Sequence, residues 1–242
     1  MLLVRPRSLG LALICTLFVS GPARADLFDY VRKDDAAFAW KKMGQTPLPD
    51  GTVTELELMS QNWQGIVWKH GVQVCLPRGV KPGGKMFLWN QGGTPSILSA
   101  AFGMELAKKM GAPVALVFSI PNQPLLDGKR EDALIAETFV RYLKTKDESW
   151  PLLFPMAKSL VKAMDALQHF SKEKAQTEVK TFGMTGASKR GWTSWLSAAA
   201  DKRIVATAPM VIDILNFPVQ MKHQKATWGF YSEQIGDYTS KA

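Results

Sequence analysis

Ser188 stands in a sequence context that could make it a catalytic nucleophile. The segment KTFGMTGASKRGWTSW, residues 180–195, leads from an apolar run through Gly186 and Ala187 to this serine, and residues with helical spacing follow. A serine on a sharp turn between a buried strand and a helix presents its hydroxyl for attack, an arrangement called a nucleophile elbow. A serine that caps the start of an ordinary helix would occupy the same position. The segment therefore leaves two interpretations of Ser188, a nucleophile or an N-cap.

The glycines around Ser188 fit an elbow on one side only. The turn of an elbow is so tight that the residues two before and two after the serine need small side chains. Gly186 meets the first demand, but Arg190 occupies the second position and the next glycine, Gly191, comes one residue late. A G-x-S pattern alone occurs by chance in many proteins. The place of the segment in the fold must therefore decide its meaning.

A second glycine-rich segment could complete the chemistry of Ser188. An elbow enzyme stabilises the developing oxyanion with the backbone N–H of the residue after the nucleophile, here Lys189, and with an N–H from a loop after an early strand. The segment QGGTPS, residues 91–96, is such a loop, and Gly92 or Gly93 could bring its backbone close to a substrate oxygen. The alternative is a plain turn between a strand and a helix.

The acid and the base of a triad are harder to find. In this arrangement the chain order is serine, acid, histidine, and His223 is the only histidine after Ser188. Asp213, at the end of an apolar run, is the candidate acid. The two lie about ten residues apart, which leaves no room for the strands that usually separate acid from histidine. His70 and His169 precede the serine and are expected to be structural or surface residues.

The surrounding pattern predicts an α/β sheet whose strands position these residues. Alternating residues over 51–63 and 66–78 predict an antiparallel pair, and residues 27–42 an amphipathic arm before it. Apolar runs and helical spacing then alternate, which favours parallel strands with crossover helices. The predicted strands cover 85–90, 112–120, 179–185 and 203–213, and the predicted helices 97–111, 131–144, 151–170 and 189–201. Ligands meet such sheets at the carboxyl ends of the strands, so the loops after Asn90, Ile120 and Thr185 matter most.

Residues 1–25 have the features of a secretory signal peptide. Arg5 and Arg7 precede an apolar run over residues 9–19, and Ala23 and Ala25 are the small residues that a signal peptidase reads. The run is about half the ~20 residues that a membrane span needs. We therefore expect cleavage after Ala25, export to the periplasm or medium, no stable membrane span afterwards, and one domain over residues 26–242.

Charge and cysteine usage exclude several classes of protein. The net charge is +9, or +6 without residues 1–25, and the basic residues are dispersed, which favours a solvated surface over a nucleic-acid partner. Cys75 is the only cysteine after residue 25, so no internal disulfide is expected there, and its apolar neighbours predict a buried thiol. No Cys/His cluster, P-loop or GxGxxG motif is present, so neither a metal nor a cofactor is expected.

Several segments together resemble the PhoPQ-activated pathogenicity-related family of exported bacterial proteins. The resemblance covers nearly all of the chain after the leader and is carried by residues 29–40, 58–77, 119–168, 182–216 and 223–238. It implies an α/β-hydrolase-like fold with a mostly parallel sheet. The family's name reflects regulation by a two-component system that senses envelope stress, and members are linked to virulence and to resistance against antimicrobial peptides. The family's serine motif falls on residues 186–191, so the late glycine is a family trait.

The serine motif and the QGG loop favour a serine hydrolase of ester or amide bonds in or near the envelope, with Ser188 as its nucleophile. Its substrate would be a small molecule, a peptide or an envelope component. Family members continue well past the segment 223–238, so we expect this chain to be a truncated form whose sheet lacks its C-terminal strands. The alternatives are a nonfunctional remnant of a longer gene, or an exported binding protein. In a binding protein, Lys189 and Arg190 with Trp192 and Trp195 would shape a recognition surface.

Overall fold

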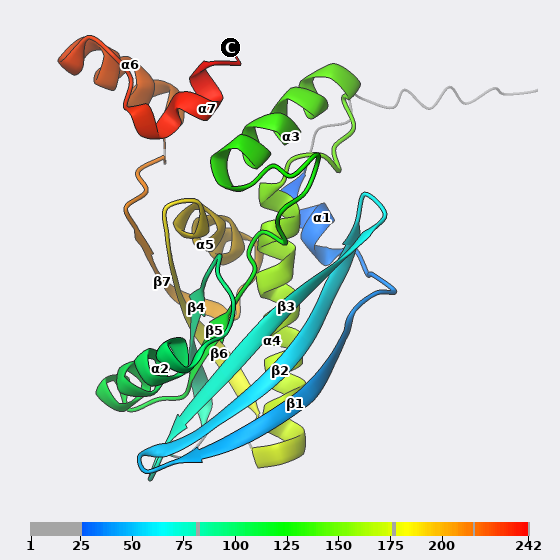
Figure 1. The fold of residues 1–242 in the computed structure, drawn as a ribbon, viewed down its shortest axis with the longest axis vertical. Coiled ribbons are helices and arrows are strands. Elements are labelled where there is room, and N and C mark those ends of the chain that lie inside the picture. The colour runs from blue at the N-terminus through cyan, green and yellow to red at the C-terminus, as the bar shows by residue number, and fades with distance from the viewer. Residues whose placement is uncertain (1–25, 81–82, 176–177, 215, 242) are drawn as a thin grey trace, which may run out of the picture.

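The computed structural model describes residues 26–80, 83–175, 178–214 and 216–241, so the predicted signal peptide lies outside the described residues. Within them, seven strands form one mixed sheet in the order β1-β2-β3-β5-β4-β6-β7 (Figure 1). No helix in this part of the chain combines the length and the apolar character needed to cross a membrane. The strands are β1 Ala39–Leu48, β2 Gly51–Trp63, β3 Ile66–Pro77, β4 Gly84–Asn90, β5 Val114–Val117, β6 Val179–Ala187 and β7 Ile204–Met210.

The N-terminal edge of the sheet is an antiparallel meander of three long strands. β2 pairs with β3 as the alternating pattern predicts, and β1 adds a third strand outside them. The predicted amphipathic arm over 27–42 consists of a short helix, α1 Leu27–Arg32, and the start of an edge strand, and Tyr30, Phe38 and Trp40 pack against the core. Most side chains of β1 are exposed, and two are lysines. Charged edge strands resist further pairing, and they lack the apolar alternation that reveals a strand in sequence.

The strands after β3 place the loops of interest at one edge. β4 pairs in parallel with β5 on one side and with β6 on the other, and β6 pairs in parallel with β7. The strand order reverses at β4, and such a reversal opens a crevice at the carboxyl ends of the strands. The loops after β4, β5 and β6 therefore meet at one edge, as expected.

The last strand departs from the sequence prediction. β7 ends at Met210, so Asp213 lies three residues beyond the strand. Its apolar residues favour a buried strand, but most of its side chains are at least partly exposed, and Val205 is 63% exposed. Its apolar composition resembles that of β5, which is fully buried. The two strands differ because β5 lies inside the sheet, whereas β7 is its edge.

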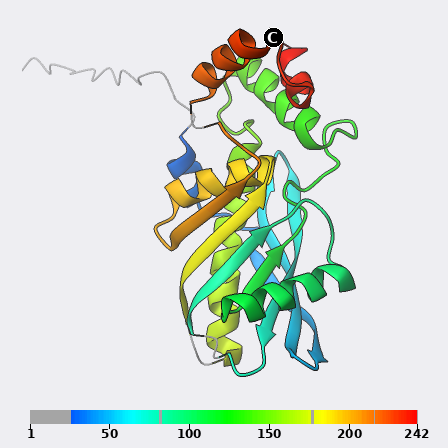
Figure 2. The same cartoon turned by 90° about the vertical axis from the view of Figure 1, so that its left-hand side faces the viewer.

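Helices cover both faces of the sheet (Figures 1 and 2). α2 Ile97–Met110 packs on one face against β3 and β5, and it ends as predicted at Gly111, which has a φ of 59°. α4 Leu153–Ala175 and α5 Lys189–Ala200 pack together on the other face with α1. The remaining helices lie beyond the carboxyl ends of the parallel strands, where α7 contacts α3. They are α3 Glu131–Thr145, α6 Phe217–Trp228, the 3₁₀ turn Glu233–Ile235 and α7 Gly236–Thr239.

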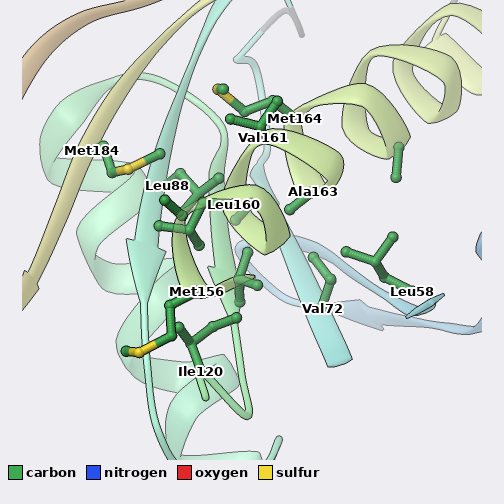
Figure 3. Packing of buried hydrophobic residues seen from close by; sticks show 14 of the residues in the cluster. Leu58, Val72, Leu88, Ile120, Met156, Leu160, Val161, Ala163, Met164 and Met184 are labelled. Atoms are coloured by element: carbon green, nitrogen blue, oxygen red, sulfur yellow. The ribbon is translucent and has the colours of Figure 1, made fainter. Parts of the chain in front are cut away.

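The larger hydrophobic core lies between α4 and the sheet. Figure 3 shows Met156 and Leu160 of α4 beside Leu88 of β4 and Ile120, all fully buried. A smaller core beneath α2 contains Cys75, and burial raises the pKa of its thiol to about 12. Cys75 is thus the buried, unreactive thiol that its sequence context predicts.

Candidate active site

Ser188 occupies a strained turn between β6 and α5. Its backbone has φ 53° and ψ −126°, outside the regions that non-glycine residues normally adopt. A capping serine has an extended backbone and accepts a hydrogen bond from the first turn of its helix. The side chain of Ser188 makes no capping hydrogen bond. Ser188 therefore stands at the start of α5 without capping it through its side chain. Its backbone conformation, which costs about 1–3 kcal/mol of strain, is of the kind that a nucleophile elbow requires.

The two glycines around the serine are required by close packing. A Cβ on Gly186 would lie 2.7 Å from the backbone oxygen of Arg190. A Cβ on Gly191 would lie 2.5 Å from the side chain of Ile212 and 3.0 Å from the oxygen of Gly186. The late glycine is thus the point where α5 touches the segment after β7. Because Gly191 takes this contact, position 190 is free to carry a long side chain.

The side chain of Arg190 contacts the neighbouring loops. Its Nε donates to the backbone oxygen of Ile120 at 2.6 Å, and its two terminal nitrogens bind the carboxylate of Glu131 at 2.5 and 2.7 Å. The guanidinium also fills the space beside Gly92, where a Cβ would overlap it. The backbone oxygen of Arg190 accepts a hydrogen bond from the Asn90 amide at 2.9 Å. One residue therefore joins the elbow to the ends of β4, β5 and the start of α3.

An ionic cluster neutralises the basic pair after the serine. Lys189 Nζ lies 2.9 Å from Glu131 and 2.8 Å from Asp132. Burial raises the pKa of Glu131, but hydrogen bonds from Arg190, Gln123 and Lys189 outweigh it and lower the pKa to about 2. Lys189 is only 8% exposed. Lys189 and Arg190 are therefore paired with carboxylates rather than displayed as free positive charges.

A cavity of about 310 Å³ opens next to Ser188. Its walls come from the start of α5, from residues 211–214, from one face of α6 and from α7. Trp192 and Phe217 supply apolar surface, and Tyr238 donates a hydrogen bond to Asp132 at 2.8 Å. Val211 also lines the cavity and has a φ of 47°, which is unusual for a β-branched residue. Strained backbone on two walls of one cavity is typical of a functional site.

The predicted oxyanion donors lie at this edge of the sheet. Lys189 is the first residue of α5, so its N–H belongs to the unpaired first turn, where the helix dipole favours negative charge. The space beside Gly92 is filled by Arg190, and no atom lies within 4 Å of the position that a Cβ on Gly93 would take. The oxygen of Gly93 accepts a hydrogen bond from the N–H of Ser119 at 3.0 Å. The oxyanion role of the three residues stays a prediction.

The candidate acid, Asp213, lines the cavity beside Ser188, whereas the candidate base, His223, does not. Asp213 lines the cavity with Ser188 and accepts a hydrogen bond from Gln220 at 3.0 Å. His223 is exposed in the middle of α6, and it is not among the residues that line the cavity. In the described part of the chain, the cavity walls contain no histidine.

The other two histidines have the structural and surface positions expected of them. His169 is exposed, whereas His70 on β3 is buried. His70 Nδ1 donates to the oxygen of Phe118 at 3.0 Å, and Nε2 lies 2.9 Å from Ser60 Oγ. Burial lowers the pKa of His70 to about 4, against the weaker effect of hydrogen bonds to the backbone. Among the described residues, no group of three or more histidine, cysteine or carboxylate side chains is arranged to hold a metal ion.

Sequence reasoning missed three residues of this site: Glu131, Asp132 and Tyr238. The acidic pair was visible as two carboxylates at the start of a predicted helix, which is a common way to complement the helix dipole. Nothing in the spacing indicated that both would bind the basic pair 57 to 59 residues away. No local sequence pattern indicated the role of Tyr238, because its partner Asp132 lies 106 residues away in the sequence.

A known protein family matches nearly all of the described chain. The model of the PhoPQ-activated pathogenicity-related protein family matches residues 27–242. The chain belongs to this family. A curated relative is Autocrine proliferation repressor protein A of Dictyostelium discoideum, which is 35% identical over 248 residues. The alignment covers 96% of this chain and 49% of that relative. The PhoPQ-related chain thus spans about half the length of the curated relative that it matches.

Solved structures with a similar fold are α/β-hydrolase esterases. One structure of the glucuronoyl esterase from Solibacter usitatus has a TM-score of 0.51 and 12% identity, covering 86% of this chain and 62% of that one. Another structure of a Solibacter usitatus glucuronoyl esterase has a TM-score of 0.50 and 15% identity, covering 72% and 52%. At such identities the likeness shows the fold alone. The PhoPQ-related chain therefore has the α/β-hydrolase-like fold that its sequence predicts.

Proposed function

We propose that this chain carries the nucleophile and the oxyanion site of a serine hydrolase that acts on ester bonds. The observation that carries the proposal is the strained backbone of Ser188, which lines a cavity and makes no capping hydrogen bond with its side chain. Strain of this kind persists only where the surrounding structure enforces it, and here Arg190, Gly186 and Gly191 do so. The fold shared with esterases supports an ester rather than an amide as the substrate bond.

The proposed reaction follows from the placement of these groups. Ser188 Oγ attacks the ester carbonyl carbon, and the carbonyl oxygen becomes an oxyanion that the N–H groups of Lys189 and of Gly92 or Gly93 stabilise. The C–O bond to the alcohol then breaks, the alcohol leaves with the proton lost by Ser188, and water later hydrolyses the acyl-enzyme. Asp213, which lines the same cavity, would orient the base in this proposal. Because the described cavity walls contain no histidine, we expect slow turnover, since a serine without its base loses several orders of magnitude in rate.

Fluorophosphonate labelling tests the proposal. We expect a folded chain to be labelled slowly, and labelling to be lost in Ser188→Ala. The matched control is Ser197→Ala on the same helix, whose hydroxyl instead binds the oxygen of Thr193 at 2.8 Å. Added imidazole is expected to raise the labelling rate, because it supplies a base at a cavity that has room for it. Labelling that survives Ser188→Ala unchanged would overturn the proposal.

A second candidate function is binding without turnover, and the lack of a histidine on the described cavity walls favours it. A p-nitrophenyl ester separates the two functions. Under binding alone, the ester would change the tryptophan fluorescence equally in the unmodified chain and in Ser188→Ala, because Trp192 lines the cavity. No nitrophenolate would be released by either protein. Release that depends on Ser188 would exclude binding alone.

Export is part of the proposal, because residues 1–25 have the pattern of a signal peptide. Asp26 is the N-cap of α1 and accepts hydrogen bonds from the N–H groups of Phe28 and Asp29. Cleavage after Ala25 would therefore leave α1 intact. N-terminal sequencing of the protein from a periplasmic fraction should begin at Asp26. A chain that keeps Met1 in that fraction, or that stays in the cytoplasm, would contradict export. A role in envelope stress or virulence remains part of the same proposal.

A further inference from the structure

Arg190 stands where a nucleophile elbow normally has a small residue. In this chain the close contact falls one residue later, at Gly191, where a Cβ would collide with Ile212 and with the oxygen of Gly186. The side chain of Arg190 therefore points away from β7 toward the loops after β4 and β5, where it is largely buried. Placing a large, always charged side chain in this position demands a specific set of partners.

The partners of Arg190 come from separate loops at the site. The oxygen of Ile120 accepts from Nε, and Glu131 accepts from both terminal nitrogens in a bidentate pair. The planar guanidinium lies against the Cα of Gly92, in the loop that carries the predicted oxyanion donor. The backbone oxygen of the same arginine is bound by Asn90, two residues before Gly92. Bidentate pairs fix geometry more strictly than a lysine could.

We propose that Arg190 is a positioning residue that fixes the loop of Gly92 and Gly93 relative to Ser188 and thereby sets the geometry of the oxyanion hole. This inference rests on the proposed function. Oxyanion donors act only within about 3 Å of the developing charge, so a small shift of this loop removes most of their effect. The contact of the guanidinium with Gly92 explains why this position has no Cβ. Glu131, held by Gln123, Lys189 and Arg190, anchors the arginine.

The test separates a reaction that develops an oxyanion from one that does not. In a Ser188→Cys chain, acylation by p-nitrophenyl acetate passes through a tetrahedral oxyanion and releases nitrophenolate as the thioester forms. Alkylation of the same thiolate by iodoacetamide forms a C–S bond and releases iodide, without an oxyanion. The ratio of the two rates cancels changes in thiol access and ionisation. The protein used begins at Asp26 and so lacks Cys15, and Cys75 does not interfere because it is buried.

We expect Arg190→Lys to lower the ratio of acylation to alkylation at least about tenfold, since loss of one oxyanion donor costs 10²–10³-fold in rate in other hydrolases. Gly92→Ala should have the same effect, because its Cβ would displace the guanidinium. The two changes combined should cost little more than either alone, since they disturb the same contact.

The matched control is Arg203→Lys at the opposite end of the strands. Arg203 also binds carboxylates, Asp201 at 2.7 Å and Asp165 at 2.8 Å, but it precedes β7 and lies away from the cavity. We expect the rate ratio to stay within about twofold of that of the Ser188→Cys chain. A ratio unchanged by both Arg190→Lys and Gly92→Ala would overturn the positioning role.

Failure of the proposed function has a different signature. In that case the ratio of acylation to alkylation in the Ser188→Cys chain, with Arg190 unchanged, would be no higher than the ratio for free N-acetylcysteine. If Arg190→Lys does not fold, Gly92→Ala and Glu131→Gln carry the test. Both retain the arginine, and Glu131→Gln keeps the shape of its partner.

Discussion

Ser60 on β2 and Ser188 after β6 have opposite surroundings. Ser60 lies 2.9 Å from His70 and 3.0 Å from Ser159, and all three side chains are fully buried. Ser188 is partly exposed at a cavity beside a helix N-terminus, and no histidine stands among the described residues of that cavity. A serine–histidine pair without access serves stability. Access to a cavity and a strained backbone are the features on which the proposed reactivity of Ser188 rests.

The two regions also have opposite effects on the stability of the fold. The hydrogen bonds around Ser60 include Gln61, which donates to Ser159 and to the oxygen of Pro155. A buried polar network with its partners in place stabilises the fold and specifies its packing. At Ser188 the strained backbone costs stability, and the contacts of Arg190 hold it in place.

Removal of the buried histidine should have the largest effect on stability. His70→Ala would remove one hydrogen-bond partner from Ser60, which keeps Ser159, and one from the oxygen of Phe118, and it would open a cavity in the core. We expect the free energy of unfolding in urea to fall by about 3–4 kcal/mol. The exposed His169→Ala should change it by less than about 0.5 kcal/mol. Equal effects of the two substitutions would show that the network around Ser60 does not stabilise the fold.

Stability should also depend on pH through His70. Burial lowers the pKa of the folded histidine to about 4, from 6.5 for the unfolded chain, so the unfolded chain takes up a proton that the folded chain excludes. The contribution is fully present above pH 6.5 and is lost as pH falls toward 4. We expect a loss on the order of 2–3 kcal/mol over this range. Urea titrations at several pH values measure it, and His70→Gln should remove this component. A slope equal in both proteins would contradict the assignment.

Relief of strain at Ser188 should give a smaller effect of opposite sign. Glycine adopts positive φ without a steric penalty, so Ser188→Gly should raise the free energy of unfolding by about 1 kcal/mol. Ser188→Ala keeps the Cβ and the strain, and should stay within about 0.5 kcal/mol of the unmodified chain. Comparison of the two variants by urea unfolding isolates the backbone term. A glycine variant no more stable than the alanine variant would show that the turn stores no strain.

Much of the fold could be predicted from local pattern. Continuous apolar runs identified the strands near Leu116 and Met184, and Gly111 marked the end of a helix. β1 was missed because an edge strand carries polar side chains on both faces. The exposure of β7 was missed because its apolar residues match those of a central strand, and only its place in the sheet distinguishes them.

At the candidate site too, the features with a local sequence pattern were predicted and the contacts between distant residues were not. The strand-to-helix turn at Ser188 was predicted because a strand, a small residue and a helix follow one another locally. The roles of Arg190 and Glu131 were not, because an ion pair between residues 59 apart leaves no periodic trace in the sequence. The late glycine had a local signal, but its reason, contact with Ile212, required the path of the chain after β7.

Mass-spectrometric mapping of the serine that reacts with a fluorophosphonate tests the comparison most directly. The unmodified, folded chain contains both serines, so each serves as the other's control. We expect the adduct on Ser188 and none on Ser60, although only Ser60 has a histidine at hydrogen-bond distance. An adduct on Ser60, or none on Ser188 after prolonged exposure with imidazole, would contradict the account.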